Sequence, residues 1–430
     1  MIERYSVSRT IGSELVRVGT LQRSARGQER FSYAESYLGR GGSPLSLSLP
    51  LRSEDYAASD IRPYFDGLLP EGPTRSAIVA RLLVPETDWL AILGSSGLDC
   101  IGDVVVEPED PEALEVRPWR RGTYVALSDG DLRDVVFNLS TLAKSSEESR
   151  LSLAGNQGKV GLAHAPDTSL RDGWLRPEGG AASTHILKVS DMSRIAEFEI
   201  VCMGAASRCG LRVAGIQALQ WGKPVACIQR FDRNVVYDEG GLQVERLHQE
   251  DLAQAFALSP QSKYLELEGG TYAAIARLLR HRSSDPLTDI NQLARLAVFD
   301  YLVGNCDNHL KNLSVLHGAE TLRLSPAYDI VCTTFFEKFT RNMGRRLGST
   351  RSIDLVCPND FLILSKEIGL GVRRMRRICS ELAEAVPEAL MWATERDADV
   401  LEALPYSAED IIDDMPSRRM VVDAFARGAD

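Results

Sequence analysis

The sequence lacks several features that mark particular classes of protein. Its eight cysteines include no CxxC pair, and no cysteine or histidine pair has zinc-ligand spacing, which argues against a disulfide framework or a structural zinc site. It has no apolar run of about 18 residues and no repeat period. Because its first residues, MIERYSVSRT, also lack the layout of a signal peptide, we expect a cytoplasmic protein without a membrane segment.

The composition is that of an ordinary folded protein. The chain has 430 residues, of which 44% are hydrophobic and 25% are charged, and this length fits two or three domains. Its 49 Lys and Arg against 60 Asp and Glu give a formal charge of −11, which repels the phosphates of nucleic acids. We therefore do not expect the chain to bind DNA by itself.

Alternation and helical spacing divide the chain into a β-rich first part and a helical second part. LSLSLPL at 45–51 alternates like a strand, and the stretch 107–120 resembles a linker. A helix is predicted over 195–209, and the WGKP turn within 213–233 predicts a hairpin. The later pattern is mainly helical, so we expect two lobes that meet near residue 231.

The most informative segment follows the apolar helix predicted over 290–305. Asp307 precedes Asn312 by five residues, the spacing in protein kinases of the aspartate that orients the acceptor hydroxyl and the asparagine that binds magnesium. Asp329, after a strand-like segment, is placed to supply a second magnesium ligand. The alternatives are a polar turn for the first two residues and a turn or helix cap for Asp329.

Upstream residues fit a phosphate site. Lys188 lies within the apolar strand HILKV, where an ammonium group is costly unless it meets an anion. Glu199 on the next helix could pair with it, as in kinases, and the segment GNQGK at 155–159 could bind phosphate through its backbone N–H groups. The alternatives are a lysine at a sheet edge, a solvated glutamate and an ordinary hairpin turn.

Other residues admit a second interpretation. His309 and Asp307 form a D-x-H pair that could bind a metal in a phosphohydrolase, although a histidine packed against the loop is favoured. An arginine cluster in a loop after Asp329 could contact phosphate or an acidic partner, and a later one is expected to form a solvated helix face. These clusters are Arg341, Arg345, Arg346 and Arg351, and Arg373, Arg374, Arg376 and Arg377.

A glycine-containing loop, a lysine, a helix glutamate, an Asp-x4-Asn loop and a later aspartate occur here in the order of a protein kinase. The chain resembles the HipA-type serine/threonine kinases, the toxins of bacterial type II toxin–antitoxin pairs, over nearly its whole length. The strings that carry this likeness are SPLSLSLP at 43–50, FDGLLPEG at 65–72, DCIG at 99–102, SLAGNQGK at 152–159, QRFDR at 229–233 and QED at 249–251.

The resemblance implies an α+β, protein-kinase-like, two-lobed fold with an additional small N-terminal domain, divided at 1–120, 121–231 and 232–430. It implies Asp307 as the catalytic aspartate and Asn312 and Asp329 as Mg²⁺ ligands. It also implies autophosphorylation at Ser152 and an ion pair between Lys188 and Glu199. The residues expected to bind ATP are Gly155, Gln157, Lys159, Lys188, Gln229, Arg230, Phe231, His309 and Lys311.

The resemblance further implies a Mg-ATP-dependent toxin that phosphorylates an aminoacyl-tRNA synthetase, chiefly the glutamyl enzyme, so that translation stalls and cells arrest and persist. Phosphorylated Ser152 would switch it off. A helix-turn-helix antitoxin of the HipB type is the expected partner, and DNA would be reached only through it. The alternatives are an antitoxin-binding co-repressor with little or no kinase activity, and the phosphohydrolase that uses Asp307 and His309.

Overall fold

The computed structural model describes residues 2–96, 99–110, 112, 115–118, 122–137, 139, 158–189, 194–238, 241–318 and 321–428. The chain forms two compact units. The first comprises Met1–Asp191, Trp221–Lys223 and Cys227–Ser262, and the second comprises Met192–Gln220, Pro224–Ala226 and Lys263–Asp430. This division differs from the boundaries near 120 and 231, which stay predictions.

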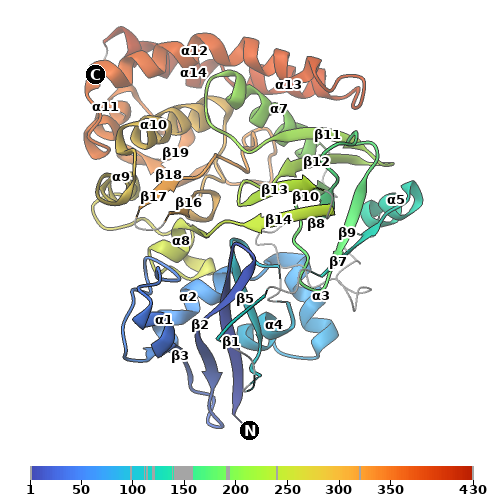
Figure 1. Cartoon of the computed structure of the whole chain (residues 1–430). Coiled ribbons are helices and arrows are strands. Elements are labelled where there is room, and N and C mark those ends of the chain that lie inside the picture. The colour runs from blue at the N-terminus through green and yellow to red at the C-terminus, as the bar shows by residue number, and fades with distance from the viewer. Residues whose placement is uncertain are drawn as a thin grey trace. The chain divides into compact units, whose positions relative to one another are not determined.

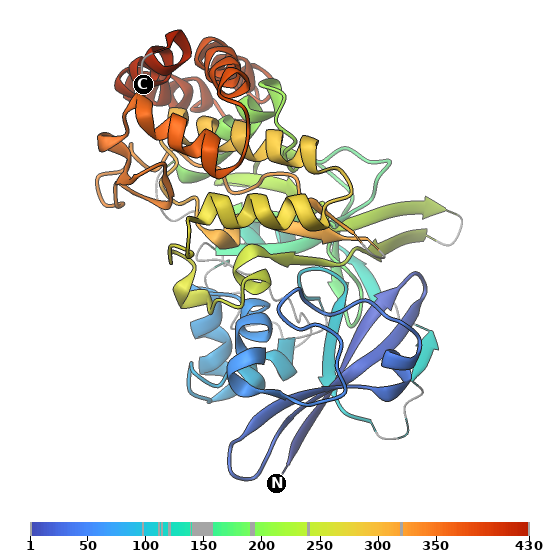
Figure 2. The ribbon, with the colours of Figure 1, turned by 90° about the vertical axis from the view of Figure 1, so that its left-hand side faces the viewer.

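An antiparallel sheet opens the first unit, with its strands in the order β4-β3-β2-β1-β5 and with β6 paired to β2. Figure 2 shows β1 and β2, in dark blue, running alongside each other. The elements of this part are β1 (Glu3–Ile11), β2 (Glu14–Arg23), β3 (Glu29–Tyr33), α1 (Glu35–Gly39), β4 (Tyr56–Ala57), α2 (Ala58–Gly67), α3 (Gly72–Leu82), α4 (Trp89–Ser96), β5 (Val104–Pro108) and β6 (Val116–Pro118).

The helices of this part pack aromatic side chains against the sheet. Phe31 of β3 lies 5.6 Å from Phe65 of α2, and Phe65 stacks on Trp89 of α4, as measured between ring centroids. All three side chains are buried, which favours the folded state because each aromatic ring removes a large apolar area from water. The N-terminal sheet therefore has a core of its own.

Two expectations for this part were wrong. The segment 45–51 is a tight turn closed by a bridge between Ser46 and Leu49, not a strand. The Ser46 hydroxyl accepts from the Ser48 N–H, and the Glu250 carboxylate accepts from the Leu47 N–H, so side chains satisfy the groups that a strand would have paired. Within 107–120, β6 pairs with β2 and so belongs to the sheet.

The rest of the first unit holds a second sheet, in which β10, β8, β9 and β7 are neighbours in that order. The hairpin of β13 and β14 and the short helix α8 follow. The elements are β7 (Thr123–Ala126), α5 (Asp129–Phe137), β8 (Gly158–His164), β9 (Trp174–Glu178), β10 (His185–Val189), β13 (Arg233–Asp238), β14 (Gly241–Arg246), β15 (Gln249–Asp251), α8 (Leu252–Ala255) and η1 (Pro260–Ser262).

The second unit is mainly helical, as expected, and its longest helix, α12, packs against α7, α10 and α14. Figure 1 shows α14 and α13 beside α12. The helices are α7 (Ile195–Arg208), α9 (Thr271–Arg282), α10 (Pro286–Val303), η2 (Leu310–Asn312), η3 (Ile353–Leu355), α11 (Pro358–Glu367), α12 (Val372–Glu395), α13 (Leu404–Asp414) and α14 (Pro416–Arg427). The helix predicted over 195–209 is confirmed.

Short strands complete the second unit. They are β11 (Ile216–Gln220), β12 (Pro224–Gln229, which runs on into the first unit), β16 (Ser314–His317), β17 (Leu322–Leu324), β18 (Asn342–Leu347) and β19 (Thr350–Ser352). The neighbouring strands β11 and β12 confirm the hairpin predicted within 213–233. Among the described residues, no helix has the length and apolar character needed to cross a bilayer.

Candidate active site

The loop that carries Asp307 begins where α10 ends, and the local sequence fixes both ends of that helix. Asp285 caps the helix by accepting the Thr288 N–H at 3.2 Å, and Pro286 occupies the first turn. Gly304 ends it with a φ of +78°, and a side chain there would meet the Thr334 hydroxyl at 2.0 Å. A glycine is therefore required at the point where the chain enters the loop.

Asp307 is the exposed group of this loop. Its side chain is 52% exposed, whereas Cys306, Asn308 and His309 beside it are buried. The Asn312 side-chain amide donates to the Asp307 carbonyl at 2.8 Å. The two residues that the kinase-like spacing selected are thus joined directly, and the Asn312 amide oxygen is the atom of that side chain suited to a cation.

The backbone of the loop is held by residues from two later segments. The Thr333 hydroxyl donates to the Gly304 carbonyl at 3.1 Å and accepts from the Cys306 N–H at 2.8 Å. The Gly344 N–H donates to the Cys306 carbonyl at 2.8 Å, and a β-carbon on Gly344 would lie 2.6 Å from the His309 nitrogen. β18 therefore lies directly against the loop, and its glycine permits that approach.

Asp300, near the end of α10, contacts the loop and is fully buried. Its carboxylate accepts from Asn305 at 2.9 Å and from Asn308 at 3.5 Å, and it forms an ion pair with Arg345 at 3.2 Å. Burial raises the pKa of Asp300 to about 6, although Arg345 and the two amides act in the opposite direction. Sequence reasoning missed Asp300, because an aspartate inside an apolar helix has no motif around it.

Asp329 has a backbone φ of +60°, a left-handed conformation that is uncommon outside glycine. The preceding residue ties this segment to the loop, since the Tyr328 hydroxyl donates to the Lys311 carbonyl at 2.7 Å. The same hydroxyl contacts the Ser314 hydroxyl at 2.6 Å. Tyr328 thus brings the segment of Asp329 against the turn that holds Asn312.

The described residues include no group of three or more His, Cys, Asp and Glu side chains that could hold a metal. Magnesium in phosphoryl-transfer sites is usually held by one or two carboxylates together with substrate phosphates and water. Asn312 and Asp329 each have a side-chain oxygen that could bind such an ion. Tyr328 links the segments that carry them. These residues therefore fit Mg²⁺ bound together with a nucleotide.

Tyr264 is a further contact of the loop that sequence reasoning missed. Its hydroxyl donates to Asp307 Oδ1 at 2.6 Å. Its ring lies edge-on to the His309 ring, with 5.0 Å between the centroids. His309 is buried between the loop and this ring, as expected for a structural histidine. No spacing rule connects residue 264 with residue 307, so only the folded chain shows the contact.

In the first unit, Lys188 and Lys159 face each other across two strands. The register of β10 and β8 sets Lys188 directly opposite Lys159, and Lys188 is 7% exposed. Residues opposite one another in a sheet point to the same side, and like charges in such a pair repel. Two ammonium groups on one side of a sheet suit an anion with several charges, such as a polyphosphate.

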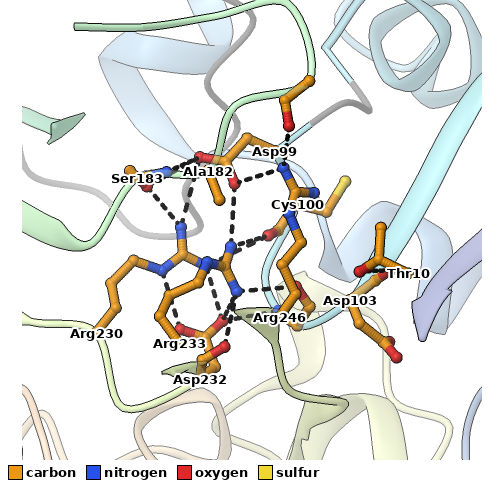
Figure 3. A network of polar contacts seen from close by, with 12 residues as sticks. Thr10, Asp99, Cys100, Asp103, Ala182, Ser183, Arg230, Asp232, Arg233 and Arg246 are labelled. Carbon is orange, nitrogen blue, oxygen red and sulfur yellow. Dashed lines mark hydrogen bonds and ion pairs between the residues drawn. The ribbon is translucent and has the colours of Figure 1, made fainter. Parts of the chain in front are cut away.

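The guanidinium of Arg230, a residue expected at the nucleotide, belongs to a network of polar contacts in the first unit (Figure 3). It donates to both carboxylate oxygens of Asp232, at 2.9 and 2.7 Å, and to the Ser183 hydroxyl at 2.9 Å. Arg233 donates to Asp99 at 3.0 Å and to the Cys100 carbonyl at 3.0 Å. The contact of Arg230 with ATP stays a prediction.

The arginines after Asp329 were expected in a loop, and this was wrong, whereas their contact with a phosphate or an acidic partner stays a prediction. They lie in β18 and β19 or beside them, and each pairs with a carboxylate of the second unit. The pairs are Arg341 with Asp354, Arg345 with Asp300, Arg346 with Glu266 and Glu367, and Arg351 with Glu266. Of these residues, the buried Arg345 contacts the loop itself, because its guanidinium pairs with Asp300 and its N–H donates to the Asn308 side chain.

Two family models match the chain. The model described as the HipA-like C-terminal domain matches residues 151–390, and the one described as the HipA N-terminal domain matches residues 12–107. The chain belongs to the HipA family. This confirms the resemblance on which the fold and the site residues were expected.

Individual relatives agree with this membership. Y4mE of Sinorhizobium fredii is 33% identical over 390 residues, which cover 89% of this chain and 91% of that protein. The serine/threonine-protein kinase toxin HipA of Shewanella oneidensis is 24% identical over 379 residues, or 84% of each chain. HipA in a solved Shewanella oneidensis complex of HipA, HipB and operator DNA matches with a TM-score of 0.80, 99% coverage of both chains and 20% identity. The expected α+β, kinase-like fold is confirmed.

Several roles expected from the HipA resemblance stay predictions. Ser152, Gly155 and Gln157 lie outside the described residues. Lys188 is in the first unit and Glu199, buried on α7, is in the second, so their ion pair stays a prediction. The ATP contacts expected from Gln229, Phe231, His309 and Lys311 also stay predictions.

Proposed function

We propose that this chain is the toxin of a toxin–antitoxin pair and acts as a Mg-ATP-dependent serine/threonine protein kinase. The observation that carries the proposal is the exposed carboxylate of Asp307 on an otherwise buried loop, tied through its carbonyl to Asn312. The relative named as a serine/threonine-protein kinase toxin supports the same activity. Catalysis of phosphoryl transfer needs mainly positioning and charge neutralisation.

In this proposal each residue has one task. Asp307 accepts the proton of a serine or threonine hydroxyl as that oxygen bonds to the γ-phosphorus and the bond between the γ-phosphorus and ADP breaks. Lys188 and Lys159 bind phosphate oxygens. Asn312 and Asp329 would hold Mg²⁺, which supplies positive charge against the phosphates. Glu199 keeps its expected part as the partner of Lys188.

We also propose a protein substrate and a regulatory switch, which membership of the HipA family alone does not establish. We assign an aminoacyl-tRNA synthetase, the glutamyl enzyme first, as the protein that is phosphorylated, and Ser152 as the residue whose autophosphorylation inactivates the toxin. Both rest on the resemblance. The partner is a HipB-type antitoxin, which the solved complex of a relative with HipB and operator DNA supports. With a formal charge of −11, the chain would reach DNA through that partner.

The first experiment measures the intact mass of phosphatase-treated protein after incubation with Mg-ATP, followed by mapping of the phosphopeptide. Asp307→Asn should slow the gain of phosphate about 100-fold or more, because it removes the proton acceptor, and should leave ATP affinity nearly unchanged. Asp413→Asn, at an exposed position of α13, is the matched control. Purified glutamyl-tRNA synthetase added to the same reaction tests the substrate.

The outcomes separate the candidate functions. Phosphate on Ser152 in the unsubstituted chain and in Asp413→Asn, but not in Asp307→Asn, supports the kinase and its switch. Free phosphate from ATP without protein phosphorylation would favour the phosphohydrolase. No phosphate transfer at all, with tight binding of a HipB-type antitoxin retained, would overturn the kinase in favour of the co-repressor.

A further inference from the structure

The hydroxyl of Tyr264 meets the carboxylate of Asp307 at a position open to water. Tyr264 is 41% exposed and the Asp307 side chain is 52% exposed, yet 2.6 Å separate the phenol oxygen from Oδ1. An ionised carboxylate only accepts hydrogen bonds, so the phenol is the donor. His309 Nε2, at 3.8 Å from the same oxygen, is too distant for a hydrogen bond.

The segment of Tyr264 is fastened to the loop that carries Asp307. The Leu310 N–H donates to the Lys263 carbonyl at 3.2 Å, and Arg351 donates to the Tyr264 carbonyl at 2.9 Å. The Tyr264 ring also packs edge-on against His309. The backbone that carries the Tyr264 phenol is therefore held against the loop of Asp307.

We propose that Tyr264 is a positioning residue for phosphoryl transfer, an inference that rests on the proposed kinase function. A free aspartate side chain at this exposure would rotate about its two side-chain bonds. The hydrogen bond from Tyr264 to Oδ1 limits this rotation and so helps to hold the Asp307 carboxylate in one orientation for the acceptor hydroxyl. A misplacement of a catalytic group by about 1 Å can slow a reaction about 100-fold.

A different role for the same contact would be inhibition, in which the phenol occupies the place of the acceptor hydroxyl. Such a group has to leave when a substrate enters. Here the hydrogen bonds to the Lys263 and Tyr264 carbonyls hold the backbone in place, and rotation of the side chain would break the packing of the ring on His309. The anchored backbone therefore favours positioning, and the two roles predict effects of opposite sign on the rate.

The test uses full-length, phosphatase-treated chains and follows phosphate incorporation in single turnovers over a range of Mg-ATP concentrations. Tyr264→Phe keeps the ring on His309 and removes only the donor, whereas Tyr264→Leu removes both. Tyr406→Phe, at a tyrosine that is 65% exposed on α13, is the control. We expect Tyr264→Phe to lower the maximal rate about 10- to 100-fold, with the half-saturating ATP concentration and the melting temperature unchanged.

Each result has a defined meaning. A slow Tyr264→Phe with normal ATP dependence supports positioning, because loss of packing alone would spare this variant and impair only Tyr264→Leu. An unchanged Tyr264→Phe overturns the inference, and a faster one replaces it with the inhibitory role. If the unsubstituted chain transfers no phosphate, the proposed function fails, and this is distinguishable because Tyr406→Phe then fails equally.

Discussion

Two buried carboxylate clusters, one in each compact unit, have opposite pKa shifts. In the second unit, Asp300 faces one guanidinium, that of Arg345, and two side-chain amides, and burial raises its pKa to about 6. In the first unit, Asp99 and Asp232 face Arg230, Arg233 and Arg246 (Figure 3).

Burial alone would raise the pKa of each first-unit carboxyl as well. There the guanidinium groups outweigh it, and the pKa of Asp99 and that of Asp232 are both lowered. The pKa of Asp103 is also lowered, because His248 and Arg9 together outweigh the effect of its burial. The number of cations around a buried carboxyl, rather than the extent of its burial, therefore decides the sign of the shift.

The difference has consequences for what each cluster can do. The first-unit carboxylates stay ionised over the whole physiological range, so they hold the segment of Asp99 to Asp103 against Arg230 and Arg233 at any such pH. Asp300, whose pKa is raised to about 6, instead changes its charge near that pH while it contacts Asn305 and Asn308 of the loop of Asp307. Aspartates and arginines thus form a cluster that keeps its charges in the first unit and a cluster that titrates in the second unit.

The largest effect is expected from removing one anion of the first-unit cluster. Asp232→Asn leaves Arg230 and Arg233 buried beside a neutral side chain, and breaking a buried ion pair in this way typically costs about 3–5 kcal/mol. Urea unfolding measures the loss. Asp167→Asn, at an exposed turn, is the control, and an equal stability of both variants would contradict the importance of this cluster.

The second prediction concerns the pH dependence of stability, to which Asp300 should contribute with a sign opposite to that of the first-unit carboxylates. Its pKa is raised from 3.8 to about 6, so between these values the native chain keeps a proton that the unfolded chain has released. The free energy of unfolding then falls as pH rises through this range, by up to about 3 kcal/mol in all. Groups whose pKa is lowered, such as Asp232, stabilise the chain at higher pH, and this contribution is lost only as the pH falls below about 4.

The measurement compares the unsubstituted chain with Asp300→Asn from pH 4 to pH 7. Only the difference between the two curves is used, because loss of the charge opposite Arg345 also shifts the curve of the variant as a whole. The difference should change between pH 4 and 6 and be flat above about pH 7. Parallel curves would show that Asp300 does not titrate in this range.

The part of the site that could be predicted from the sequence is the part that is local in the sequence. Asp307 and Asn312 stand five residues apart on one loop, so their relation survives in the spacing. The helix over 195–209 and the hairpin around the WGKP turn were also found, because periodicity and turn chemistry act over a few residues.

The rest depends on partners that the sequence does not place. Asp300, Tyr264 and Arg345 come from three separate segments, and their contacts exist only after folding. The ion pairs of the arginines in β18 and β19 were not predicted, because their carboxylates, such as Glu266, lie far away in the sequence. LSLSLPL alternates like a strand, but the hydrogen bonds of Ser46 and Glu250 turn the chain there.

A smaller effect is expected where the loop is held by backbone packing rather than by charge. A β-carbon in Gly344→Ala would lie 2.6 Å from the His309 nitrogen and 2.8 Å from the Asn308 carbonyl carbon, both backbone atoms that cannot rotate away. We expect a loss of about 1–3 kcal/mol in the free energy of unfolding, as for other overpacked sites. Phosphate transfer should also slow, because the shift displaces the backbone next to Asp307.

Gly371→Ala is the matched control for this substitution, since a β-carbon there meets nothing within 4 Å. If both variants unfold and react like the unsubstituted chain, the loop tolerates displacement by β18, and its other contacts, such as those of Asp300 and Thr333, suffice to hold its shape. If Gly344→Ala is impaired equally at pH 5 and pH 7, packing acts independently of the charge on Asp300. An impairment that grows at pH 7 would instead show that packing and charge support the loop together.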